Sequence, residues 1–171
     1  MRYFVKPLSL LPAIAMMYII FSFSSQDGAT SSKLSYGVSH DLVSAVDHLL
    51  DLELTPKQIN HGISKIHYYV RKLAHVTEYF LLAVSISIPI YVYGIRGIWI
   101  ILTSGILCIG FAALDELHQL FVVGRGAAIK DVFIDSFGSL LGIIFVRIFG
   151  YIMRKCITEP LSARRQLSRQ H

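Results

Sequence analysis

The chain has 171 residues, of which 54% are hydrophobic and only 16% are charged, and it carries a formal net charge of +5. Soluble domains are usually about 45–50% apolar and about 25% charged, so this composition argues against an ordinary soluble core, and the length suits one domain rather than two. The basic residues flank apolar runs, and the positive charge therefore indicates membrane orientation rather than nucleic-acid binding.

Four apolar runs are expected to cross a membrane as helices. They fall at about residues 7–24, 73–93, 98–118 and 132–153, and a span needs about 20 largely apolar residues. The second and fourth runs meet this length easily, whereas the first and third do so only if their polar ends lie in the interface. The sequence predicts an all-α integral membrane four-helix bundle over residues 1–155, followed by a basic cytoplasmic tail at 156–171.

The long first loop, which is expected to be extracytoplasmic, carries an amphipathic segment. Residues 24–36 are rich in Ser, Gly and Thr and are expected to form a loop. Between 38 and 54, Leu42, Val46 and Leu49 share one helical face, and acidic residues take the other side. We expect this helix to lie on the outer membrane surface or on the bundle.

A further helix should begin at the end of this loop. Thr55 is placed as its N-cap, Pro56 in its first turn, and Gln58 completes a capping box. Apolar residues then recur at helical spacing as far as Leu73. The helix should therefore run directly into the second span.

Basic residues set the expected orientation. Arg2 and Lys6 precede the first span, Arg96 lies between the second and third, and several basic residues follow the fourth. With an even number of spans these all lie on one side, which the positive-inside rule makes the cytoplasm, together with both termini. Neither Cys108 nor Cys156 lies in an outer loop, so no structural disulfide is expected.

Unusual polar residues gather at the outer end of the predicted bundle. The spans alternate in direction, so the ends of the first and third meet the starts of the second and fourth. Ionisable groups inside a membrane need partners or a wet cavity, and they are functional by default. The candidates are Gln26, Arg71, His75, Glu78, Glu116, Gln119, Arg125, Asp131 and Asp135.

The spacing of these residues predicts which faces they occupy. Arg71, His75 and Glu78 stand at i, i+4 and i+7, so they share one face of the second span and should point into the bundle. On the fourth span, acids and then glycines recur at helical spacing: Asp131, Asp135, Gly138 and Gly142. The glycine pair allows another helix to approach closely. Interfacial anchoring of the basic residues, and hydrogen bonds that only fix packing, remain alternatives.

Three stretches resemble the VanZ-like family of membrane proteins: "FSFSSQ" at 21–26, "RKLAHVTEYFLLA" at 71–83 and "DELHQLFVVGRGAAIKDVFIDSFGSLLG" at 115–142. The resemblance runs from the first span to the end of the fourth. It implies an integral protein of a bacterial cytoplasmic membrane and cell envelope, with a suggested link to teicoplanin-type glycopeptide resistance. Its motifs map onto Arg71, His75, Glu78, Tyr79, Glu116, Gln119, Arg125, Asp131, Asp135, Gly138 and Gly142.

The favoured function is an outer-leaflet polar pocket that binds or modifies a lipid or glycan head group. Cationic side chains would hold phosphate, while histidine and carboxyl groups would serve as acid and base. The expected partners are a membrane lipid or envelope precursor and the bilayer, with no nucleic acid. The catalytic candidates are Glu116, Asp131, His75 and Glu78, and the binding candidates are Gln26, Arg71, Gln119, Arg125 and Asp135.

Two other classes remain open. One is a metal-dependent membrane enzyme that holds Zn²⁺ or a harder divalent ion, for which nitrogen and oxygen ligands are available in sufficient number. The ligand candidates are His75, Glu78, Glu116, His118, Asp131 and Asp135. The other is a non-catalytic structural or interaction protein whose ionic cluster fixes the bundle.

Overall fold

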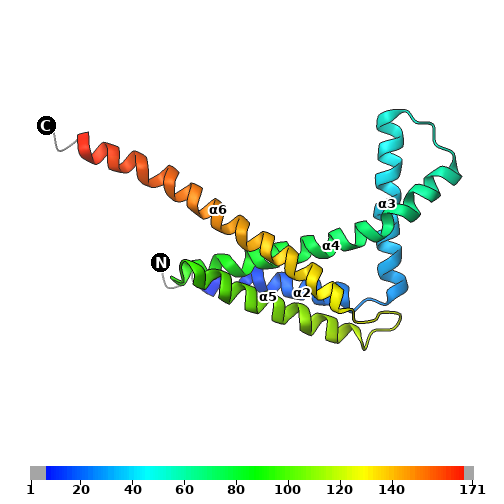
Figure 1. Ribbon diagram of the computed structural model, residues 1–171, viewed down its shortest axis with the longest axis horizontal. Helices are drawn as coiled ribbons and strands as arrows, with labels where there is room; N and C mark the ends of the chain where they lie inside the picture. The colour runs from blue at the N-terminus through cyan, green and yellow to red at the C-terminus, as the bar shows by residue number, and fades with distance from the viewer. Residues whose placement is uncertain (1–6, 168–171) are drawn as a thin grey trace.

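The computed structural model describes residues 7–167, with side chains as far as Met153 and at Lys155. This part of the chain contains helices and no strands: α2 (Leu11–Ser24), α3 (Gly28–Leu50), α4 (Pro56–Val92), α5 (Ile98–Gln119) and α6 (Ile129–Leu167). α2, α4, α5 and α6 pack against one another, and we call these four helices the helical core (Figure 1). Expectations for Arg2, Lys6 and the side chains of 156–171, including Cys156, fall outside the described residues.

Three helices are long and apolar enough to cross a membrane. They are Pro56–Val92, Ile98–Gln119 and Ile129–Met153. The first predicted span corresponds to α2, an apolar helix of 14 residues within the described part of the chain. Large apolar side chains cover the outside of these helices, as on Ile106 (70% exposed) and Phe133 (72% exposed). Such an apolar exterior suits hydrocarbon rather than water, as expected of a membrane protein with three helices of spanning length.

The expectation of a loop over residues 24–36 is wrong, because α3 begins at Gly28. Asp27 caps this helix: its carboxylate accepts hydrogen bonds from the Thr30 amide at 2.7 Å and the Thr30 hydroxyl at 2.8 Å. Further along, Ser35 and Ser39 donate to carbonyl groups four residues earlier. Hydroxyl groups that bond back in this way let a Ser-rich segment remain helical.

The predicted start of the next helix is confirmed. The Thr55 amide donates to Gln58 Oε1 at 2.9 Å, and α4 begins at Pro56. It then continues without interruption to Val92, a total of 37 residues. One rigid helix therefore joins the outer loop to the membrane-spanning region.

The predicted close approach of the glycine helix is also confirmed, and the neighbour is α4. A Cβ atom built on Gly138 would lie 2.4 Å from the Val76 carbonyl oxygen, and one on Gly142 would lie 2.4 Å from that of Phe80. Only glycine leaves room for the two backbones at this distance. This contact brings the first turns of α6 against the part of α4 that carries His75.

Candidate functional site

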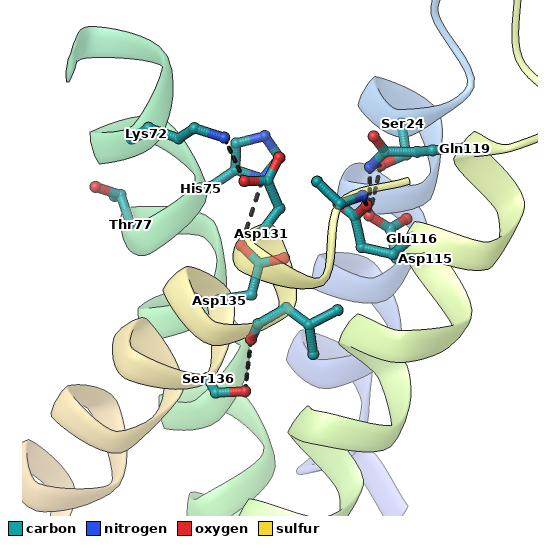
Figure 2. Close-up of polar contacts among 12 residues, drawn as sticks. Ser24, Lys72, His75, Thr77, Asp115, Glu116, Gln119, Asp131, Asp135 and Ser136 are labelled. Atoms are coloured by element: carbon teal, nitrogen blue, oxygen red, sulfur yellow. Dashed lines mark hydrogen bonds and ion pairs between the residues drawn. The ribbon is translucent and has the colours of Figure 1, made fainter. Parts of the chain in front are cut away.

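Polar side chains of α4 and α6 face each other near the start of α6. Lys72 forms an ion pair and hydrogen bond with Asp131, and His75 Nδ1 lies 3.4 Å from Asp135 Oδ1. Asp135 is fully buried, whereas Asp131 lies in the first turn of α6. Figure 2 shows these four residues in two successive layers between the helices. We call them the α4–α6 cluster.

A second group joins the ends of α2 and α5. The Ser24 hydroxyl donates to Asp115 Oδ2 at 2.6 Å, and Gln119 Nε2 donates to Ser24 Oγ at 3.0 Å and to Asp115 Oδ2 at 3.1 Å. All three side chains are buried. They form the α2–α5 cluster, which lies opposite the first cluster (Figure 2).

The segment between α5 and α6 connects the two clusters. Glu116 Oε2 accepts a hydrogen bond of 2.9 Å from the Ala128 amide, just before α6. The Arg125 guanidinium donates to the Phe23 carbonyl oxygen at 2.8 Å, at the end of α2. The Gly28 amide donates to the Val123 carbonyl oxygen at 3.0 Å. These hydrogen bonds hold the α5–α6 loop across one end of the helical core. We call this end, which contains the two clusters and the loop, the polar end.

Several buried polar atoms at the polar end have no hydrogen-bond partner among the described residues. Buried polar atoms are normally paired, and leaving one unpaired costs about 1–3 kcal/mol. A dense group of unpaired atoms indicates a place where water or a bound molecule completes the bonding. The atoms are Tyr79 Oη, Asp115 Oδ1, Glu116 Oε1, Arg125 Nε and Asp135 Oδ2, while His75 Nδ1 and Asp135 Oδ1 have only each other, at 3.4 Å.

Tyr79 lies between the two clusters. Its side chain is fully buried and its ring packs near that of Phe111, with centroids 6.3 Å apart. Its unpaired hydroxyl is within range of the charges of Asp115 and Glu116 on α5, of Asp135 on α6 and of Glu78 on its own helix. The phenol is therefore a hydrogen-bonding group placed among carboxyl groups from three helices.

Two basic groups, Arg71 and Arg125, lie near each other at the polar end. Burial, and next the positive charge of nearby Arg71, lower the pKa of the Arg125 guanidinium. The carboxylates of Asp115, Glu78 and Glu116 act on Arg125 in the opposite sense. Glu78 is half-buried and within electrostatic range of His75, Asp135, Asp115 and Arg125.

The predicted site residues are distributed over both clusters and not gathered in one closed group. His75, Asp131 and Asp135 belong to the α4–α6 cluster, Gln119 belongs to the α2–α5 cluster, and Glu116 bonds to the loop. Gln26 is half-buried in the turn between α2 and α3. Glu116 lies within electrostatic range of both Asp131 and Arg125, but each of the three takes its direct partner elsewhere.

Sequence reasoning did not select four residues that the geometry places in the site: Ser24, Lys72, Tyr79 and Asp115. Interfacial anchoring is one of the two interpretations that the sequence leaves open for Lys72. Lys72 and His75 stand three residues apart on α4, and Asp131 and Asp135 stand four apart on α6, so both pairs can meet between the two helices. Tyr79 was read only through its family motif. A helical wheel of α4 was the available signal, because Lys72, His75 and Tyr79 stand at i, i+3 and i+7.

The candidate metal ligands do not gather in a ligand set. Over the described side chains, no group of three or more His, Cys, Asp or Glu residues is arranged to hold a metal ion. His118 turns toward α2, where its ring is tilted by 31° to that of Phe21 with the centroids 4.5 Å apart, and Nε2 lies 3.1 Å from Ser25 Oγ. It is thereby separated from His75, the other histidine of the proposed ligand set.

Comparison with known proteins gave one match. The sequence model of a protein family described as VanZ/LLP1 matches residues 9–150. No curated protein and no solved structure matches the chain. The matched range contains both polar clusters, the loop that connects them and the glycine contact between α4 and α6.

Proposed function

The chain belongs to the VanZ/LLP1 family, and on that premise we propose that its polar end binds or modifies the anionic head group of a membrane lipid or lipid-linked envelope precursor. The protein would be an integral component of a bacterial cell envelope. The two clusters would form the walls of this site, and the α5–α6 loop would form its rim.

The group of buried, unpaired polar atoms is the observation that carries this proposal. Hydrocarbon offers them no hydrogen bonds, so within a membrane they are satisfied only by water or by a polar molecule. They include both donors and acceptors, and they come from α4, α5, α6 and the α5–α6 loop. A head group with several oxygens and hydroxyls has the matching chemistry.

The basic, acidic and neutral side chains of the proposed site would have different roles. Arg71 and Arg125 would hold a phosphate, because guanidinium groups bind its oxygens with paired, charge-assisted hydrogen bonds. His75, Glu78, Glu116 and Asp131 would act as acid and base if the head group is chemically altered. Gln26, Gln119 and Asp135 would bind polar groups of the ligand.

The competing possibility is a purely structural role. It is favoured by the Lys72–Asp131 ion pair and by the hydrogen bonds that Gln119 and Ser24 donate to Asp115 Oδ2. Under that account, the polar end only locks the helices together. The two accounts differ in what happens to ligand binding when a side chain is changed without loss of the fold.

Orientation and physiological role extend the proposal. The polar end would face the outer side of the cytoplasmic membrane, with both termini in the cytoplasm. A cysteine at Asp41, on the polar side of α3, should then react with a membrane-impermeant maleimide in intact cells, and a cysteine at Arg96 should not. A role in teicoplanin-type resistance follows if the bound head group belongs to an envelope precursor, and expression in a susceptible bacterium would raise the inhibitory concentration.

Two arginines at opposite ends of the helical core provide a matched test. Arg125 donates to the Phe23 carbonyl oxygen at 2.8 Å, and Arg96 donates to that of Tyr91 at the same distance. Each side chain is replaced by glutamine, and phosphatidylglycerol retained by the purified protein is counted by native mass spectrometry. Arg125→Gln should lose the retained lipid, whereas Arg96→Gln should keep it. Equal retention by both variants would contradict a site at the polar end.

A further inference from the structure

α3 carries an apolar stripe that no other part of the described structure covers. Its members recur at spacings of three and four and are about half exposed or more: Leu34 (52%), Val38 (52%), Leu42 (48%), Val46 (47%) and Leu49 (80%). The opposite side carries Lys33, His40, Asp41, Ser44 and His48. A monomer in water rarely leaves a continuous apolar stripe exposed, so something other than water is expected to cover it.

Only one side of α3 is used for packing on α4. Ser32 Oγ lies 3.3 Å from His67 Nε2, and the Tyr36 hydroxyl donates to Asn60 Oδ1 at 3.1 Å. Farther along, the Val43 side chain reaches within 3.4 Å of the position that a Cβ on Gly62 would occupy. On a helical wheel this contact side lies next to the apolar stripe and leaves the stripe free.

The orientation of α3 relative to the helical core indicates what covers the stripe. Figure 1 shows α3 running crosswise to the helical core, just beyond the ends of α2 and α5. A helix perpendicular to membrane-spanning helices, at the level where they end, lies parallel to the membrane surface. We propose that α3 is an interfacial helix whose apolar stripe inserts into the lipid surface around the polar end.

Two exposed tyrosines support this level independently. Tyr68 and Tyr69 are 60% and 71% exposed and directly follow His67, the α4 residue that contacts α3. Tyrosine favours the boundary between head groups and acyl chains, where its ring and hydroxyl are both accommodated. The aromatic pair and the α3 stripe thus mark the same plane on two different helices.

This placement also sets the depth of the polar site. At about 1.5 Å of rise per residue, His75 lies roughly 12 Å along α4 from His67. Half the hydrocarbon core of a bilayer is about 15 Å thick. The α4–α6 cluster would therefore lie within one leaflet, below the plane of α3, where a lipid head group can enter from the side.

Apolar contact, not charge, is the source of this surface binding. Between Gly28 and Leu50, the acidic residues Asp41 and Asp47 outnumber the one lysine, Lys33. The helix therefore has no excess of positive charge that would draw it to anionic lipids. Insertion should be as deep in neutral phosphatidylcholine as in a mixture with phosphatidylglycerol.

Spin labelling in nanodiscs tests the proposal directly. In a full-length protein with Cys108→Ala and Cys156→Ser, a nitroxide is attached at Leu42→Cys, within the stripe, and at His40→Cys, on the polar side. Collision rates with oxygen, which concentrates in lipid, and with a water-soluble nickel chelate are then compared. The oxygen-to-nickel ratio should be several-fold higher at Leu42 than at His40, with no change when anionic lipid is added.

A second pair, Leu49→Cys and Ser44→Cys, repeats the comparison if either first variant fails to accumulate. Equal nickel accessibility on the two sides would mean that α3 stands in water, and the proposal would be lost. Dipolar broadening at Leu42 that disappears on dilution with unlabelled protein would mean that the stripe packs on a second copy. That result would equally overturn insertion into lipid.

Discussion

At the polar end, Asp115, Glu116 and Asp135 are buried and keep carboxylate oxygens without partners. Toward the opposite end, the buried Ser87 donates to Ser104 at 3.0 Å, and both hydroxyls are satisfied. An apolar pocket of about 520 Å³ lies there too, lined by α2, α4 and α5 side chains such as Met17, Ile86 and Leu107. One half of the helical core is thus lined by apolar side chains and its buried hydroxyls are paired, while the other half holds buried polar atoms without hydrogen-bond partners among the described residues.

This contrast indicates that the charged residues are not the main source of stability in the packing of these helices. The glycine contact between α4 and α6 and the apolar cluster around Leu82, Ala83 and Ala112 hold the helices without ionic groups. Charged groups inside a membrane are costly, and proteins retain them for a function. The following predictions test whether the two halves differ in this way.

The largest effect is expected from Gly138→Ala. The new Cβ would lie 2.4 Å from the Val76 carbonyl oxygen, which belongs to the backbone of α4 and cannot move aside. Overpacking of this kind costs about 1–3 kcal/mol or more, so folded protein should fall sharply in detergent extracts. Gly150→Ala is the control, because nothing lies within 4 Å of its added Cβ. Normal thermal stability of Gly138→Ala would show that α4 and α6 are less closely packed than described.

An intermediate effect is expected from removing one hydroxyl group. At the polar end the removal should lower lipid retention, and at the opposite end it should lower stability. Tyr79→Phe deletes an unpaired hydroxyl, so stability should be unchanged or slightly higher while retained lipid falls. Ser104→Ala deletes the acceptor of the Ser87 bond, so stability should fall by about 1 kcal/mol with lipid retention unchanged. Thermal melting and native mass spectrometry on both variants check the prediction. The contrast between the halves fails if Tyr79→Phe destabilises the protein and keeps its lipid.

The smallest effect concerns the start of α3. Hydrogen bonds from the Thr30 amide, and then from its hydroxyl, lower the pKa of Asp27. The ionised cap therefore stabilises the helix fully above about pH 4, the usual aspartate value, and is lost as pH falls through the lowered value. The Thr30 amide chemical shift should titrate in this acidic range, and Asp27→Asn should abolish the titration. A Thr30 shift that still titrates in Asp27→Asn would assign the effect to another group.

Much of the fold was accessible from the sequence. Three features follow from residue type and spacing along the chain: the capping box at Thr55, the continuous helix from Pro56 and the close approach at Gly138. No tertiary contact in the described structure overrides these preferences. The loop expected over 24–36 failed because composition was read without the Asp27 cap and without the back-bonding of Ser35 and Ser39. Those hydrogen bonds depend on side-chain conformation, which composition does not specify.

The sequence predicts most of the residues of the candidate site, but it does not predict which of them pair with one another. Helical spacing placed His75 and Asp135 on facing surfaces, yet it could not assign Lys72 to Asp131 or Ser24 to Asp115. Such pairs depend on the rotation of each helix about its axis, which glycine contacts and loop lengths fix only in three dimensions. The central position of Tyr79 was hidden for the same reason, because an aromatic residue within a span resembles ordinary core.

The central claim is that the polar end serves a ligand rather than the fold, and Glu116→Gln together with Asp135→Asn tests it most directly. Both changes keep size and shape and remove only the charge. Retained phosphatidylglycerol and melting temperature are measured on each variant in the same detergent. We predict that lipid retention falls in both variants, because each amide offers one acceptor oxygen where the carboxylate offers two to the head-group hydroxyls, with a melting temperature within about 4 °C of the parent, or roughly 1 kcal/mol. A parallel fall of lipid and melting temperature would contradict the claim and assign the polar end to holding the helices together.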